Sequence, residues 1–202
     1  MRAVRAVFAT LCLAWAWGSW AASAPTPEAV VTGFHAALLD NMKHGKAYGC
    51  QGRSQRLASV IDRDFDIPFI AQTVLRRHWD QLADDQRQRY TAAFRELVVA
   101  TYAQQFADFA GERFTTQDTQ NLPNGDALVH AQLKPGSGDT VSFDYVLRQK
   151  DGAWRIINII ADGVSDLALR STQYAKLYEE KGFDGLLAWI EEQTRKARAD
   201  CS

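Results

Sequence analysis

Apolar residues recur at every third or fourth position through much of the first half of the chain, a spacing typical of helices with one buried face. The first run predicts a helix that starts at Pro27 and ends by residues 45–49. A shorter helix is expected over residues 54–61 and a third over residues 67–78. Asp66 directly precedes the third run, where a short polar side chain can accept hydrogen bonds from first-turn amides.

The longest helical pattern has an unusually aromatic face. Asp84 and Asp85 begin it, at the end where the helix dipole favours negative charge. A stripe of apolar and aromatic positions about six turns long follows. On its own, such a stripe more often belongs to a packed core than to a binding site. Its members are Tyr90, Phe94, Leu97, Val98, Thr101, Tyr102, Gln105, Phe106 and Phe109.

The middle of the chain changes to a period of two, with β-branched and aromatic residues in short runs separated by turn residues. Asn124-Gly125 and Asp151-Gly152 are typical of tight turns between antiparallel strands. We therefore expect an antiparallel meander whose four strands cover residues 113–119, 127–134, 140–150 and 154–161.

Alternation along the last two of these strands predicts which side chains share a face of the sheet. In the fourth strand, Ile157 and Ile159 fall on one face and Ile156 on the other. In the third strand, one face comprises Val141, Phe143, Tyr145 and Leu147.

After the sheet, Ser165 is expected to cap another helix, because Ser accepts hydrogen bonds from first-turn amides. A nucleophilic role for Ser165 is disfavoured, since the chain lacks a G-x-S-x-G frame around it. Residues 182–187 then lead into a last amphipathic helix that ends near Arg198. The whole pattern predicts an α+β fold.

The first residues have the pattern of a secretory signal peptide. Arg2 and Arg5 supply a positive start, residues 6–17 an apolar stretch, and small residues follow. We expect residues 1–21 to be removed, with the cut between positions 21 and 24, which leaves a single domain over residues 22–202. An uncleaved anchor is the alternative, but the apolar stretch is short for a helix that needs about 20 residues to cross a bilayer.

Composition and charge exclude several classes of function. Lys and Arg number 23 and Asp and Glu 24, and no basic block accumulates, so nucleic acid is not an expected partner. Asp62, Asp64 and Asp66 alternate like the start of a calcium loop, but Ile67 and Thr73 stand where that loop needs Gly and Glu. We predict no metal site, no cofactor and no catalytic residues.

Two cysteines, Cys50 and Cys201, remain once the leader is removed. An exported protein can form disulfides. A bridge between them would fasten the tail to the body of the domain, and two free thiols are the alternative.

Residues 64–94 contain a distinctive set of residues: Asp64-Phe65, Phe69-Ile70-Ala71, Val74-Leu75, Trp79, Gln86-Arg87, Tyr90 and Phe94. Through this pattern, residues 64–114 resemble the MlaC-type periplasmic lipid-binding proteins, also called the toluene-tolerance auxiliary family. The similarity extends over about residues 28–196. The later part of the segment is similar to the hopanoid-associated HpnM branch through Thr101-Tyr102-Ala103, Phe106, Phe109 and Gly111-Glu112-Arg113-Phe114.

The resemblance implies a fold and a function. Helices from the N-terminal half and the C-terminus would pack on a curved four-stranded antiparallel sheet and enclose an apolar cavity, an outline shared with NTF2-like proteins. The protein would be a non-enzymatic, monomeric carrier in the periplasm that binds phospholipid acyl chains or a hopanoid. It would shuttle lipid between an inner-membrane lipid transporter and an outer-membrane complex.

The predicted cavity walls come from the helices and from the sheet. Arg76, Arg77 and Arg170 are candidates for contact with an anionic headgroup at the mouth. The candidate lipid-binding residues are Phe69, Val74, Leu75, Trp79, Phe94, Leu97, Val98, Tyr102, Phe106, Phe143, Tyr145, Leu147, Ile157 and Ile159.

Two other classes of protein share this outline. An NTF2-like isomerase or dehydratase would place a carboxylate or imidazole, such as Asp144 or His130, in an apolar pocket that shifts its pKa. A structural export adaptor would instead have a filled core. Whether the interior is hollow separates the adaptor from the carrier.

Overall fold

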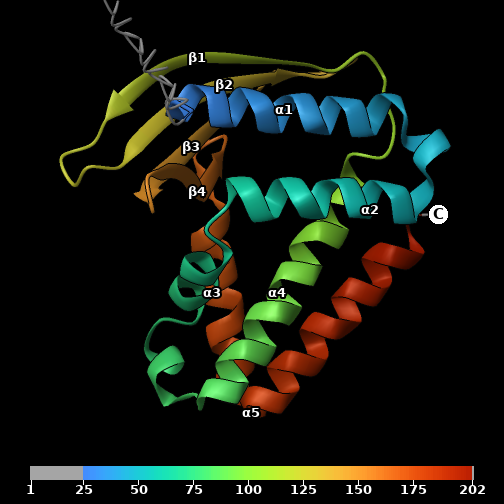
Figure 1. Cartoon of the computed structure of the whole chain (residues 1–202). Coiled ribbons are helices and arrows are strands. Elements are labelled where there is room, and N and C mark those ends of the chain that lie inside the picture. Colours follow the sequence, from blue (N-terminus) through green and yellow to red (C-terminus); the bar gives the residue numbers. More distant parts are fainter. Residues whose placement is uncertain (1–24, 202) are drawn as a thin grey trace, which may run out of the picture.

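The structure is a computed structural model that describes residues 25–201 (Figure 1). The predicted signal peptide and its cleavage site lie outside the described residues. In chain order the elements are α1 (Pro27–Lys43), α2 (Gly45–Asp64), α3 (Ile67–Leu75), the 3-10 helix η1 (Arg76–Gln81), α4 (Asp84–Gln105), β1 (Arg113–Asn121), β2 (Ala127–Lys134), β3 (Val141–Lys150), β4 (Ala153–Ala161), β5 (Val164–Ser165) and α5 (Asp166–Ala199).

The strands form one antiparallel sheet in which every strand pairs with its neighbour in sequence, in the order β1-β2-β3-β4-β5. The predicted α+β class and four-stranded meander are confirmed. The two-residue strand β5 is an addition to the prediction, and it leads directly into α5. Ser165 caps that helix as predicted, because its Oγ accepts from the amide of Ala168 at 3.2 Å.

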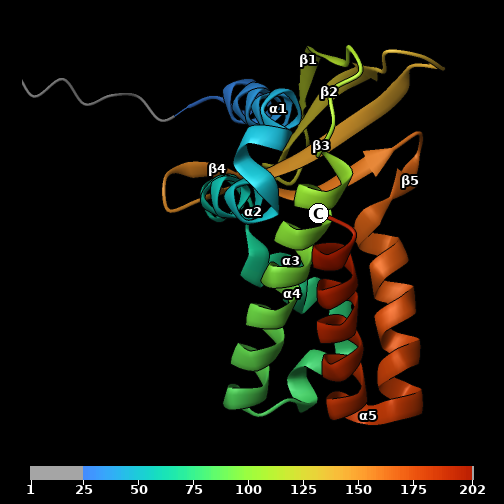
Figure 2. The same ribbon diagram turned by 90° about the vertical axis from the view of Figure 1, so that its right-hand side faces the viewer.

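The helices form two groups around the sheet. Helices α1 and α2 lie side by side, with α1 along one face of the sheet, while α3, α4 and α5 extend away from it (Figures 1 and 2). Helix α5 is interrupted at Gly182, whose φ of 66° is a conformation that glycine tolerates best, and its second half returns beside the first. The C-terminus thereby reaches α2, where Cys50 and Cys201 form a disulfide.

Several predicted helix boundaries are wrong. Helix α2 begins at Gly45, earlier than expected, and includes a break at Gly49. Helix α3 ends at Leu75 and gives way to η1, because Arg76 adopts a φ of 49° that ends regular α-helical geometry.

Helix α4 stops at Gln105, one turn short of the predicted end. At this point side chains from other helices donate hydrogen bonds to the carbonyl oxygens of the last turn. The Nε of Arg53 donates to the carbonyl of Ala103 at 3.2 Å, and the Nδ2 of Asn41 donates to that of Phe106 at 3.2 Å. Phe109 therefore lies beyond the helix and is 44% exposed.

A β-bulge in β4 changes the predicted facing of its side chains. Leu147 of β3 pairs with Ile156, whereas Val146 pairs with Asn158, so Ile157 is an extra residue in the ladder. Since one inserted residue reverses the alternation, Ile156 lies on the same face as Ile159. The prediction that Ile156 faces away from Ile159 is wrong.

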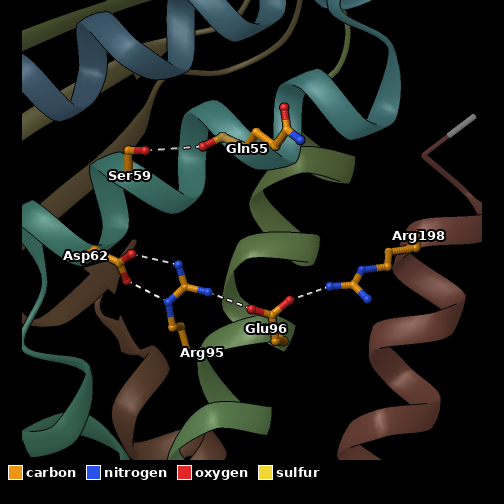
Figure 3. Close-up of polar contacts among 6 residues, drawn as sticks. All are labelled: Gln55, Ser59, Asp62, Arg95, Glu96 and Arg198. Atoms are coloured by element: carbon orange, nitrogen blue, oxygen red, sulfur yellow. Dashed lines mark hydrogen bonds and ion pairs between the residues drawn. The ribbon is translucent and has the colours of Figure 1, made fainter.

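A chain of ion pairs links three helices on the outside of the bundle (Figure 3). Arg95 of α4 donates to both carboxylate oxygens of Asp62 on α2, at 2.6 and 2.7 Å, and to Glu96 at 2.6 Å. Glu96 in turn accepts from Arg198 of α5. These contacts fix the mutual positions of α2, α4 and α5 on this side.

Candidate functional site

An apolar cavity of about 270 Å³ lies between the sheet and the helices. Its floor is the inner face of β3 and β4, and its other walls are α4, the α2–α3 junction and the start of α5. The lining residues are Phe65, Ile67, Ile70, Phe94, Val98, Thr101, Tyr102, Gln105, Phe106, Phe143, Ile156, Ile157, Asn158, Ile159, Ala161, Asp166, Leu167 and Arg170.

Helix α4 supplies the longest wall of this cavity. Phe94, Val98 and Tyr102 follow one another at intervals of four residues, which places them on one side of a helix. Tyr102 and Phe106 stack with their ring centroids 5.8 Å apart. Burial raises the pKa of Tyr102 above its ordinary value, so its hydroxyl remains protonated at neutral pH.

An ion pair borders the apolar walls. The Nε of Arg170 donates to Asp166, one turn earlier on α5, at 2.7 Å, and its guanidinium lies 5.9 Å from the ring centroid of Phe94. Burial by itself would lower the pKa of Arg170, but the adjacent carboxylate of Asp166 outweighs that effect and raises it. A permanent cation therefore lies beside the cavity, with its side chain 22% exposed.

Asn158 is the polar residue of β4 that lines the cavity, and its position is fixed by the next turn. Its Oδ1 accepts from the hydroxyl of Ser165 at 3.1 Å and from the amide of Leu167 at 3.3 Å. These bonds hold the first turn of α5, and with it the Asp166–Arg170 pair, against the sheet.

Twelve of the fourteen predicted wall residues fall into two groups. Val74, Leu75, Leu97, Tyr145 and Leu147 are buried in the packed core and do not line the cavity. Seven others do line it, and their role in lipid binding stays a prediction: Phe94, Val98, Tyr102, Phe106, Phe143, Ile157 and Ile159.

Four further predicted residues lie elsewhere. The ring of Phe69 lies 4.6 Å from the guanidinium of Arg148, and Trp79 lines a separate surface groove. Arg76 and Arg77 are exposed and are not part of the cavity wall, and Arg77 pairs with Glu179.

Sequence reasoning missed the wall at the junction of α2 and α3. Phe65 follows the last residue of α2, between the predicted helices, and Ile67 is the first residue of α3, before the apolar face chosen from that run. The signal for Phe65 was the Asp64-Phe65 pair in the family pattern, and Ile67 has no counterpart in that pattern. Ile156 was missed for a different reason, because the bulge at Ile157 turns it toward the cavity.

The residues considered for catalysis lie away from the cavity. His130 and Asp144 form a cross-strand pair whose Nδ1 and Oδ1 are 2.6 Å apart, on the face opposite Ala131 and Phe143. Within residues 25–201, no three His, Cys, Asp or Glu side chains are grouped so that they could hold a metal ion. No helix in that same range is long and apolar enough to cross a membrane.

The sequence model of the MlaC protein family matches residues 33–192. The chain belongs to the MlaC family. It is 23% identical over 172 residues to the toluene tolerance protein ttg2D of Pseudomonas putida, covering 80% of this chain and 77% of the relative. It is 18% identical over 144 residues to the intermembrane phospholipid transport system binding protein MlaC of Haemophilus influenzae, covering 67% of each.

A solved structure has a similar fold. The phospholipid-binding protein from Ralstonia solanacearum, determined in complex with a phospholipid, superimposes with a TM-score of 0.74. The match covers 87% of this chain and 99% of that one at 20% sequence identity, so it establishes the common fold. Membership of the HpnM branch stays a prediction.

Proposed function

We propose that this MlaC-family protein is a periplasmic carrier that binds phospholipid acyl chains in the cavity between the sheet and α4. The observation that carries the proposal is the hollow itself, walled by aliphatic and aromatic side chains and bordered by the Asp166–Arg170 pair. Ligand sites for apolar molecules typically combine such walls with a few placed polar groups.

The physical need for such a carrier follows from the cost of exposing a lipid to water. Each methylene in water costs roughly 0.8 kcal/mol, so one long acyl chain represents on the order of 10 kcal/mol. A carrier must therefore surround the acyl chains with protein that is as apolar as the membrane interior. The cavity provides this surface, and Arg170 provides a cation suited to a phosphate group.

The relatives support phospholipid as the cargo in preference to a hopanoid. One is named as the binding protein of an intermembrane phospholipid transport system, and the Ralstonia protein was solved with a phospholipid. We infer that the protein moves lipid between an inner-membrane transporter and an outer-membrane complex. The signal-like pattern of residues 1–21 agrees with export to the compartment where this traffic takes place.

We infer further that the protein is not an enzyme. The imidazole and carboxylate of His130 and Asp144 face away from the cavity. The carboxylate of Asp166, which does line it, is held by Arg170 at 2.7 Å. A general base needs to reach its substrate, and none of these three groups is free to do so inside the cavity.

Extraction of the protein with organic solvent, after purification from the periplasm, tests this function. Mass spectrometry should detect about one phospholipid per chain. Val98→Trp should reduce the loading because it fills the cavity, and Val98→Ile should retain it because it adds one methylene to the same wall. A wild-type extract without lipid would contradict the proposed carrier function. A hopanoid in place of phospholipid would contradict phospholipid as the ligand while leaving the carrier function in place.

A further inference from the structure

A second hollow of about 560 Å³ lies on the other side of the α2–α3 junction from the lipid cavity. We call it the outer groove. It opens to the surface between η1 and α4, and its members come from α2, α3, η1 and α4. They are Asp62, Phe65, Ile67, Pro68, Trp79, Arg87, Gln88, Thr91, Ala92 and Arg95.

The two hollows have Phe65 and Ile67 in common, so these side chains form a partition between them. The backbone at this point is anchored to the sheet, because the amide of Asp66 donates to the carbonyl of Ile156 at 3.0 Å. The side chain of Asp66 also pairs with Lys150 at 2.8 Å. Because the backbone is anchored here, any opening between the two spaces has to come from the side chains of Phe65 and Ile67.

The charged groups of the outer groove are already paired within the protein. Figure 3 shows the guanidinium of Arg95 held by Asp62 and Glu96. Arg87 donates to the carbonyl of Trp79 at 3.2 Å, and its guanidinium lies 5.7 Å from the Trp79 ring centroid. An occupant of this groove therefore needs no charge of its own, and it would contact the indole of Trp79 and the aliphatic stems of the two arginines.

The size of the inner cavity gives a reason for the groove to be used. Its volume of about 270 Å³ is below the range of roughly 300–1,000 Å³ that is typical for drug-sized ligands, and a phospholipid with two long chains is larger than such ligands. Together the two spaces offer about three times the volume of the inner cavity alone. The continuity of the walls makes the acyl chain itself the occupant that fits.

We propose that Phe65 and Ile67 act as a movable partition and that the distal part of a long acyl chain passes between them into the outer groove. This inference rests on the proposed lipid-binding function and adds a chain-length dependence to it. On this proposal a lipid with short chains depends little on the outer groove, whereas long chains require the partition to open.

Blocking the groove from its far side tests the partition without altering the inner cavity. Thr91→Trp places a large side chain in the groove, and Gln173→Trp is the matched control at an exposed position of α5. The probes are dioctanoyl and dipalmitoyl phosphatidylglycerol. We expect Thr91→Trp to weaken binding of the dipalmitoyl lipid by about tenfold or more, since excluding two methylenes has that effect. Binding of the dioctanoyl lipid and of both lipids by the control should be unchanged.

The outcomes separate the inference from the function on which it rests. If Thr91→Trp binds both lipids as the wild type does, the partition is refuted while the carrier function stands. If the wild-type protein binds neither lipid, the carrier function fails as well.

Fluorescence quenching provides a measurement that does not depend on the folding of Thr91→Trp. Dipalmitoyl phosphatidylglycerol with a spin label near the chain end should quench the emission component that Trp79→Phe removes, while a label near the headgroup should not. Bound lipid that quenches this component equally from both positions, or from neither, would overturn the proposal.

Discussion

The imidazole Nε2 of His35 and the hydroxyl of Tyr145 lie 2.9 Å apart, hydrogen-bonded across the interface between α1 and β3. His35 is 3% exposed and stacks on Phe114 with a centroid distance of 4.2 Å. Burial lowers the pKa of His35 from 6.5 to about 4, so the ring is neutral in the folded protein at neutral pH.

This burial predicts an acid-sensitive stability. Between pH 6.5 and about 4 the unfolded chain binds a proton at His35 and the folded chain does not, so stability is lost as the pH falls through this window. Above pH 6.5 both states are neutral and the effect is absent. We expect a contribution of about 2 to 3 kcal/mol, measured by urea unfolding at pH 7 and pH 4.5. His35→Gln should reduce the pH difference by that amount, and an unchanged difference would contradict the prediction.

The Cys50–Cys201 disulfide joins residues 151 positions apart. Closing so long a loop restricts the unfolded chain strongly, so its removal should cost roughly 2 to 5 kcal/mol. Denaturation with and without dithiothreitol measures the loss. The double variant Cys50→Ser, Cys201→Ser should be as unstable as the reduced wild type and should not respond to the reductant. A reductant effect of equal size in that variant would show that the bridge is not its cause.

We predict that Arg53 stabilises the fold where α4 ends. Its buried guanidinium donates to the carbonyls of Ala103 at 3.2 Å, Gly45 at 2.7 Å and Cys201. Arg53→Met would remove these three buried hydrogen bonds, and we expect a loss of about 3 kcal/mol or more in urea unfolding. Arg56→Met is the matched control, because Arg56 is 57% exposed, and it should change stability by less than about 1 kcal/mol. Similar losses in both variants would argue against the role of the buried bonds.

The sequence indicated most of the elements because their apolar periods are regular. It could not indicate where α4 ends, because the groups that take its last carbonyls belong to Asn41 and Arg53, far away in the chain. It also could not indicate the bulge. Residues 156–160 are apolar on both faces of β4 except at Asn158, so no break in alternation marks the inserted Ile157.

The candidate site was predictable to the extent that it follows helix geometry. Phe94, Val98 and Tyr102 were found because a four-residue interval fixes their common side on α4. Tyr145 and Leu147 share the inner face of β3 with Phe143, yet they are covered by other side chains and belong to the core. Alternation shows which face a residue is on, and only the packing of α1 and α4 decides which part of that face remains hollow.

Arg170 is expected to distinguish lipids by their phosphate. Its guanidinium lies beside the apolar wall formed by Phe94 and is held there by Asp166. Charge-assisted hydrogen bonds contribute about 1.5 to 3 kcal/mol, so Arg170→Met should weaken the binding of phosphatidylglycerol by about tenfold or more. Binding of diacylglycerol, which has the same chains without phosphate, should change little. Arg170→Met leaves the carboxylate of Asp166 unpaired, and that negative charge would itself repel a phosphate. The double variant Arg170→Met, Asp166→Asn removes this repulsion. It should still bind phosphatidylglycerol more weakly than the wild type does, with little change for diacylglycerol. Equal losses for both lipids would assign Arg170 to packing instead of headgroup recognition.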